Sequence, residues 1–251
     1  MSIPLVVWAL VPAGAPAAGR GVVTEVKRPA SAANRMHGAV IATLPGGAKR
    51  VCSGTVVHST YGSMVWTAGS CVVDRTVPML LDKVVFVPAY HDGAAPFGRW
   101  SAEYVFTKTD FLRNGNRRLD YGGLVVGKRK INGHTRTLES VVGALRLEFE
   151  KSRNRKLSVL RYPDRGPLHG KREFRCEARP DGTDDPAGSG PGPTRLPCPA
   201  RFASPGAGWV DGNALFSVTA YTKPDDHDHF YAPYLDAQAR TLYEAAADLE
   251  P

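Results

Sequence analysis

Short runs of β-branched and aromatic residues alternate with turn residues along most of the chain. Runs of this length and spacing predict antiparallel strands of an all-β fold, a sandwich or a barrel. No alternation of strands with helices and no internal repeat interrupts the pattern. The clearest expected strands are Gly38–Leu44, Gly54–His58, Met64–Ala68, Lys83–Pro88, Glu103–Thr107, Gly122–Val126, Ser158–Tyr162 and Ala214–Tyr221.

Two segments depart from this pattern. Apolar residues recur at spacings of three and four after Pro233, so we expect one amphipathic helix over Pro233–Leu249. Half of the residues in Pro180–Pro197 are Gly or Pro, which predicts a mobile loop.

The first eighteen residues combine an apolar stretch with small residues and a possible cleavage signal, Ala15-Pro16-Ala17. They resemble the back half of a secretory signal peptide, although no Lys or Arg precedes the apolar stretch. A disordered apolar tail is the alternative. Residues 1–20 are therefore left out of the expected fold.

Composition excludes several classes of protein. The 251 residues are 43% hydrophobic and 22% charged, which is ordinary for a globular chain. No apolar run reaches the roughly 18–20 residues that span a bilayer, so no membrane partner is expected. The net charge of +8 is concentrated in Arg146–Arg175, which is either a solvated strand face or a patch for an anionic ligand. Aromatic residues do not interleave with this segment, so we expect no nucleic-acid binding.

The four cysteines form no C-x-x-C pair, which gives a four-sulfur zinc site no support. Cys52 and Cys71 bracket two apolar runs joined by a turn, and Cys176 and Cys198 bracket the Gly/Pro-rich loop. We expect the disulfides Cys52–Cys71 and Cys176–Cys198, the second contributing about 3 kcal/mol, and hence an oxidising compartment. Free buried thiols are the alternative.

Several motifs stand in a characteristic order. Cys-Ser-Gly-Thr-Val-Val at Cys52–Val57 precedes Thr-Ala-Gly-Ser-Cys-Val at Thr67–Val72, and further matches follow at Val85–Tyr90, Asp120–Val126, Val159–Pro163 and Ala232–Tyr234. This set closely resembles the trypsin-like serine peptidases, most of all their secreted actinobacterial members. The resemblance implies two six-stranded antiparallel β-barrels, over residues 21–135 and 136–231, with an active site between them. Residues 232–251 would form a helix that packs on the barrels.

The resemblance also assigns catalytic positions, and this chain departs from them. Serine proteolysis needs an imidazole base, a carboxylate that orients it, a hydroxyl nucleophile and two backbone N–H donors for the oxyanion. Ser70 stands where the imidazole belongs, Asp120 matches the carboxylate, and Pro205 stands at the nucleophile. Proline lacks both a hydroxyl and an N–H, and Ala203 replaces a glycine of the same loop.

Other candidate groups are weaker. Ser204 is one residue away from the nucleophile position, and His58 is the histidine nearest in sequence to the expected cleft. The Asp225–His229 loop is dense in possible ligands, but a solvent-exposed turn explains it more simply, so no metal or other cofactor is expected. The resemblance places a substrate-binding wall at Ser217, Val218, Thr219, Ala220 and Tyr221.

The sequence therefore predicts a secreted, monomeric serine peptidase homologue that has lost catalysis and binds a peptide or protein. An active hydrolase that uses Ser204 or a metal at Asp225–His229 is the alternative. A structural module with an empty cleft is the third hypothesis.

Overall fold

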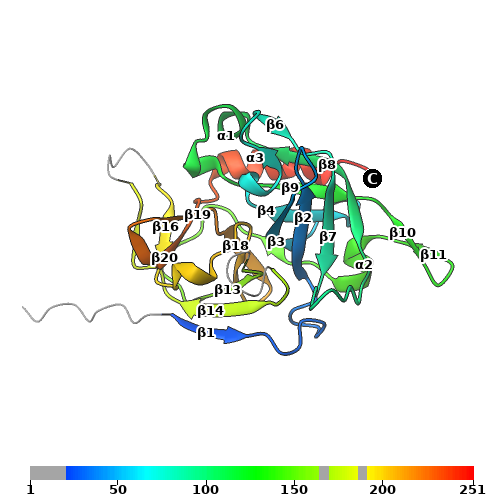
Figure 1. The fold of residues 1–251 in the computed structure, drawn as a ribbon, viewed down its shortest axis with the longest axis horizontal. Helices are drawn as coiled ribbons and strands as arrows, with labels where there is room; N and C mark the ends of the chain where they lie inside the picture. The colour runs from blue at the N-terminus through cyan, green and yellow to red at the C-terminus, as the bar shows by residue number, and fades with distance from the viewer. Residues whose placement is uncertain (1–20, 164–169, 186–190) are drawn as a thin grey trace, which may run out of the picture.

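Two β-rich halves lie side by side in the computed structural model, which describes residues 21–163, 170–185 and 191–251 (Figure 1). Each of the eight expected strands coincides with a strand of the structure. The first half is a closed barrel whose strands follow one another in the order β2 (His37–Thr43), β3 (Lys49–Val57), β4 (Met64–Thr67), β9 (Gly122–Val126), β8 (Trp100–Thr107) and β7 (Val84–Pro88). All neighbouring pairs are antiparallel.

Large apolar side chains fill this barrel. Trp66, Phe86, Trp100 and Leu124 are fully buried and belong to one core cluster. Because side chains alternate across a strand, the apolar members of each run reach the same interior. Gly46 and Gly47, both with positive φ, close the β2–β3 hairpin in a conformation that favours glycine.

The second half contains two sheets. One has the order β1 (Val22–Glu25), β14 (Phe174–Ala178), β13 (Leu157–Arg161), β17 (Gly208–Asp211), β18 (Ala214–Val218) and β12 (Arg146–Leu147). The other has the order β15 (Gly182–Thr183), β16 (Thr194–Leu196), β20 (Asp226–Ala232) and β19 (Tyr221–Lys223). This arrangement matches the expected pair of β-barrels, with a second core that includes Trp209 and Phe230.

Two local expectations need correction. β1 lies within the range 21–135 expected for the first barrel, yet it pairs with β14 of the second half. β15 and β16 pair within Pro180–Pro197, which was expected to be a loop, because their backbone groups bond to each other and to β20. Residues 186–190, where that loop was expected to be mobile, lie outside the described residues.

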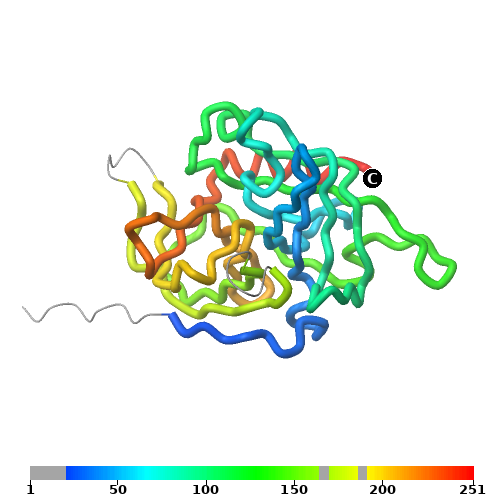
Figure 2. Tube along the Cα trace, viewed as in Figure 1, coloured from blue at the N-terminus to red at the C-terminus, as the bar shows by residue number. Residues whose placement is uncertain are grey.

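The C-terminal helix α3 spans Ala237–Ala247 and runs back across the first barrel (Figure 2). It begins four residues after Pro233 because the Asp236 side chain accepts hydrogen bonds from Gln238 N and Ala239 N, which caps the first turn. Leu235, Ala239 and Ala246 are buried in the larger core cluster, which contains the first barrel's interior and residues of the second half. Two short helices, α1 (Thr109–Asn114) and α2 (Leu138–Val142), were not expected, because one turn leaves no visible periodicity.

The cysteine pairing is confirmed. Cys52 bonds to Cys71 and Cys176 bonds to Cys198, with Cα–Cα distances of 6.0 and 6.3 Å. Among the described residues, no helix is long and apolar enough to cross a membrane. The expected signal-like segment, residues 1–20, lies outside the described residues.

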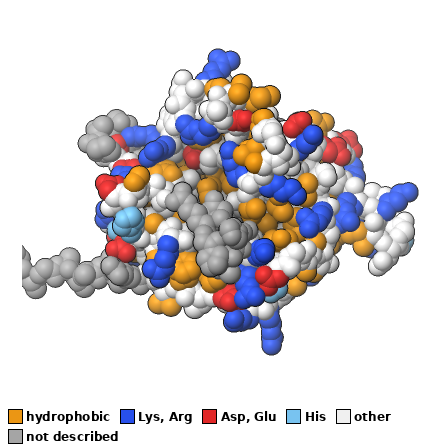
Figure 3. Space-filling model, in the orientation of Figure 1, with side chains coloured by type: hydrophobic (Ala, Val, Ile, Leu, Met, Phe, Trp, Pro, Cys, Tyr) orange, Lys and Arg blue, Asp and Glu red, His pale blue; other side chains and the backbone are white. Residues whose placement is uncertain are grey.

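The basic segment Arg146–Arg175 does not form one positive surface. Lysine and arginine side chains are distributed around the face shown in Figure 3, with acidic side chains between them. Within the segment's described part, Lys156 pairs with Glu177 at 2.9 Å, and both Arg146 and Lys151 lie within 3.4 Å of Glu148. These pairs favour the interpretation of a solvated strand face.

Candidate active-site cleft

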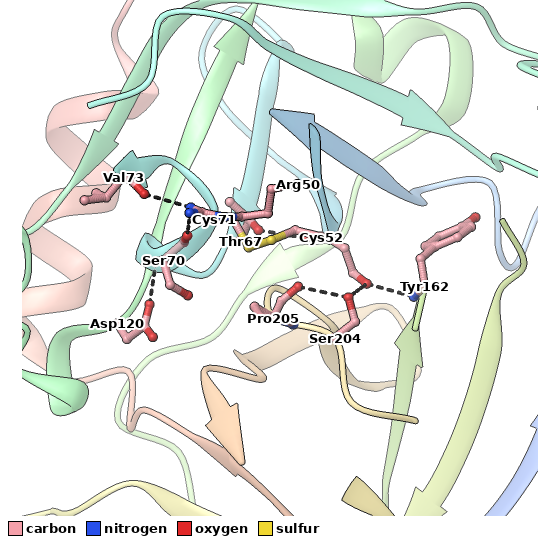
Figure 4. Close-up of a disulfide and its surroundings, with 11 residues drawn as sticks. Arg50, Cys52, Thr67, Ser70, Cys71, Val73, Asp120, Tyr162, Ser204 and Pro205 are labelled. Carbon is pink, nitrogen blue, oxygen red and sulfur yellow. Dashed lines mark hydrogen bonds between the residues drawn. A yellow bond between two sulfur atoms is a disulfide. The ribbon is translucent and has the colours of Figure 1, made fainter. Parts of the chain in front are cut away.

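Ser70 lies on a single 3-10 turn, η1 (Gly69–Cys71), directly before a disulfide (Figure 4). The Arg50 guanidinium supports this turn by donating to the carbonyls of Ser70 at 2.7 Å and Val73 at 2.8 Å. The disulfide and the arginine therefore fix the backbone position of Ser70 without any contact to its side chain. Its hydroxyl is buried and has no hydrogen-bond partner among the described residues.

Asp120 faces Ser70 from the end of a second 3-10 turn, η2 (Arg117–Leu119) (Figure 4). Its Oδ1 accepts the backbone N–H of Ser70 at 2.7 Å. Burial raises the pKa of this carboxyl to about 7, against the lowering effects of that hydrogen bond, of the nearby Ser70 hydroxyl and of the Arg75 and Arg117 charges. The structure thus brings the expected carboxylate and the expected base position together, with a backbone group as the link.

The loop at the nucleophile position has its backbone groups already bonded. Pro205 has no N–H, and its carbonyl accepts from Ser53 N at 2.9 Å. The N–H of Ala203 donates to Ala200 O at 2.9 Å, and that of Gly206 donates to Thr219 O at 2.8 Å. Gly206 has φ +78°, and a Cβ there would collide with the Ser53 carbonyl and the Thr67 hydroxyl, so the loop lies tightly against the first barrel. No N–H of Ala203, Pro205 or Gly206 is free to receive an oxyanion.

Ser204 points away from the cleft. Its side chain is fully buried and accepts a hydrogen bond from Ser53 Oγ at 3.0 Å, while Ser53 Oγ in turn accepts from Tyr162 N at 2.9 Å (Figure 4). This chain of bonds ties the loop to β3 and β13. A hydroxyl held in this way has a structural role and no adjacent base.

A cavity of about 280 Å³ lies between these elements. Six of the residues expected at the site line it: Ser70, Asp120, Pro205, Thr219, Ala220 and Tyr221. Ala203 of the nucleophile loop also lines it, together with Arg75, Arg117 and Thr222, which were not expected as site residues. Arg75 follows β5 and Arg117 begins η2, where no local sequence pattern marks them.

The other two residues of the expected wall lie elsewhere. Ser217 donates to Pro233 O at 2.5 Å and Val218 is fully buried in the core. No histidine among the described residues lines the cavity. His58 is exposed, its Nδ1 lies 2.7 Å from Glu139 Oε1, and its carbonyl accepts a hydrogen bond from the Tyr243 hydroxyl of α3.

The Asp225–His229 segment lies at the start of β20, and its side chains bond to one another and to neighbouring residues. His229 Nδ1 lies 2.7 Å from Asp226 Oδ1, its Nε2 lies 3.1 Å from Asp181 Oδ2, and the Tyr231 hydroxyl donates to Asp226. The described residues contain no group of three or more His, Cys, Asp or Glu side chains placed to hold a metal ion.

Arg161 occupies an unusual position on β13. Its side chain is fully buried, its guanidinium lies 4.7 Å from the Phe230 ring centre, and none of its nitrogens has a hydrogen-bond partner in the described part of the chain. Burial lowers its pKa to about 9. In the motif Val159–Pro163 this position would be glycine, so the side chain fills space that the motif leaves open.

Solved structures match this arrangement over nearly the whole chain. The protease Anisep from Arthrobacter nicotinovorans is 28% identical, with a TM-score of 0.77 over 91% of this chain and 100% of its own. The thermostable serine protease AL20 from an extremophilic microorganism is also 28% identical, with a TM-score of 0.77 over 88% of this chain and 100% of its own. A Glu endopeptidase is 14% identical, with a TM-score of 0.71 over 92% of this chain and 98% of its own. The chain has the fold of the trypsin-like serine proteases. No protein-family profile and no curated protein matches the sequence.

For a chain with this fold, the site has an unusual set of groups. Asp120 and the surrounding backbone are present, whereas Ser70 supplies no imidazole and Pro205 supplies neither hydroxyl nor N–H. A serine hydroxyl cannot accept a proton near neutral pH, so the side chain at position 70 supplies no general base.

Proposed function

We propose that this chain is a catalytically inactive serine protease homologue whose cleft binds a segment of peptide or protein. The state of three loop residues carries the proposal, because Pro205 has no N–H and the N–H groups of Ala203 and Gly206 are already bonded to carbonyls. Losing a single oxyanion donor costs about 2.7–4 kcal/mol of transition-state stabilisation. The absence of an imidazole and of a nucleophilic hydroxyl adds to this loss.

A binding role is supported by what remains. The cavity persists between the two halves, and Thr219, Ala220 and Tyr221 still line it. An extended peptide can pair with the backbone beside such a wall without any chemistry. One structural neighbour, from scabies mite, is described as an inactivated protease paralogue, with 15% identity and a TM-score of 0.61, so this fold persists in a protein that has lost activity.

We also propose that the chain works outside the cell, as a monomer. Two disulfides in a chain without free cysteines suit an oxidising compartment.

The test uses the disulfide-bonded protein, a panel of fluorogenic peptide substrates and a serine-directed phosphonate probe. We expect neither turnover nor covalent labelling, while an active trypsin-like enzyme treated in parallel shows both. Labelling or turnover of the order given by that enzyme would refute the proposal.

The alternative of an active hydrolase makes a different prediction. Activity carried by Ser204 would disappear in Ser204→Ala, and activity carried by Asp225–His229 would disappear with a chelator. The buried hydroxyl of Ser204, bonded to Ser53, speaks against the first route.

A further inference from the structure

Two arginines stand at the rim of the cleft, and each is held against an aromatic ring. Arg75 lies after β5 (Val73–Asp74), with its guanidinium 5.4 Å from the Phe111 ring centre. Arg117 begins η2, with its guanidinium 4.6 Å from the Tyr221 ring centre. Stacking of this kind restricts the side chain but leaves the N–H donors in the ring plane free.

Neither arginine has an ion-pair partner within 4.0 Å among the described residues, although acids are close by. Arg118, next to Arg117, pairs with Asp185 at 2.6 Å, and Lys223 pairs with Asp184 at 2.6 Å. The nearby carboxylates are thus already neutralised by other cations.

The cavity itself has an excess of positive charge. Asp120 is the one acidic group that lines it among the described residues, and it is 4% exposed. With a pKa of about 7, this carboxyl neutralises the two guanidiniums only in part at neutral pH. The buried hydroxyl of Ser70 lies in the same cavity, beside the Asp120 carboxyl.

We propose that the cleft binds its peptide through a carboxylate, which is held between the guanidiniums of Arg75 and Arg117. This proposal rests on the proposed function, because it names the chemical class of the cleft's ligand. A guanidinium offers paired donors that match the two oxygens of a carboxylate. A cavity of about 280 Å³ suits one acidic side chain or a chain terminus, with the rest of the peptide outside.

A polymeric anion fits these observations less well. Binding of a long polyanion needs a row of unpaired cations, whereas the basic side chains on the face in Figure 3 are scattered and interspersed with acids. A peptide carboxylate can come from an Asp or Glu side chain or from a free C-terminus, and the experiment separates these two sources.

The experiment measures retention of peptide mixtures on the immobilised full-length, disulfide-bonded protein. Three octapeptide mixtures share randomised flanking positions: the first is acetylated and amidated with Glu at the centre, the second is identical with Gln at the centre, and the third has Gln at the centre and a free C-terminus. We expect at least about a threefold preference for a carboxylate-bearing mixture over the neutral one, falling as NaCl rises from about 50 to about 500 mM.

Variants assign the preference to the two arginines. Arg75→Gln with Arg117→Gln should abolish this preference, with a loss of affinity of about threefold or more for the carboxylate-bearing mixture and none for the neutral mixture. Arg113→Gln is the matched control, because Arg113 is exposed on α1 and does not line the cavity. All three positions are exposed, and the melting temperature of each variant checks that it is folded.

Each outcome decides the question. Preference for the Glu mixture assigns the cleft to an acidic side chain, and preference for the free terminus assigns it to a terminal carboxylate. Equal retention of all three mixtures overturns the carboxylate but leaves peptide binding intact, whereas retention of none overturns both. A preference that survives in the double variant, or tighter binding of a sulfated oligosaccharide at the same arginines, also overturns the assignment.

Discussion

The buried carboxyl of Asp120 lowers the free energy of unfolding near neutral pH, and a single substitution should remove this effect. Its side chain is 4% exposed, and Oδ1 accepts the N–H of Ser70 at 2.7 Å. In Asp120→Asn the amide oxygen can accept the same hydrogen bond, since asparagine retains one acceptor and has nearly the same shape. The variant therefore removes the charge and leaves the contact in place.

The size of the effect follows from the pKa. Burial raises it from 3.8 to about 7 in the folded protein. Between these values the folded state binds more protons than the unfolded state, so this group makes the free energy of unfolding fall as the pH rises. The loss is complete above pH of about 8 and amounts to about 4 kcal/mol, at about 1.36 kcal/mol for each pH unit. Asp120→Asn should therefore stabilise the protein by up to this amount at pH 8 and by almost nothing at pH 4.

Urea unfolding with both disulfides intact, measured at intervals from pH 4 to pH 8, provides the test. Glu173 is also buried and its pKa is raised to about 8, but it titrates in the parent and in the variant alike, so the difference between their curves isolates Asp120. Asp225→Asn, at an exposed position, is the control and should give a curve parallel to the parent's. A variant less stable than the parent at pH 8 would show that Arg75 and Arg117 stabilise the carboxylate by more than burial costs.

Two further substitutions test the cleft and the second core. Ser70→His combined with Pro205→Ser should not restore peptide hydrolysis, because the N–H of Ala203 stays bonded within its own turn; cleavage of a fluorogenic peptide above background would contradict this. Arg161→Met should raise the free energy of unfolding by about 1–4 kcal/mol in urea at pH 7, because it replaces a buried, unpaired charge with an apolar side chain of similar volume. A loss of stability there would mean that the contact with Phe230 outweighs the desolvation of the guanidinium.

The sequence was sufficient for the strands and the disulfides because both depend on local patterns. The composition of a run such as Gly122–Val126 predicts a buried strand, and this run is β9 in the structure. The bracketing of two strands by Cys52 and Cys71 predicts their bond, because a hairpin brings its two ends together. Motif order added the positions of Ser70 and Asp120, which the structure brings into contact.

The rest depends on how distant segments meet. Arg75 and Arg117 are far apart in the chain, and only the folded connections around the cleft bring both to one cavity. The β15–β16 pair lies in a segment whose Gly and Pro content favours a loop. Its strands form because β16 pairs with β20 on one side and with β15 on the other. The helix expected from Pro233 begins at Ala237 in the structure. The Asp236 side chain caps the first turn there, and this cap has more influence than apolar spacing on where the helix begins.

The contact between Asp120 and Ser70 also bears on why a catalytic carboxylate remains in a site without a base. The carboxylate accepts a backbone N–H, and this bond is independent of the side chain at position 70. The bond fixes the N–H of Ser70 in the turn η1, while the Arg50 guanidinium donates to the carbonyl of the same residue. Removing the acceptor would leave a buried N–H without a partner, at a cost of about 1–3 kcal/mol. The hydrogen bond to the backbone N–H of Ser70 is therefore sufficient to explain why the carboxylate is present, and its presence is no sign of retained catalysis.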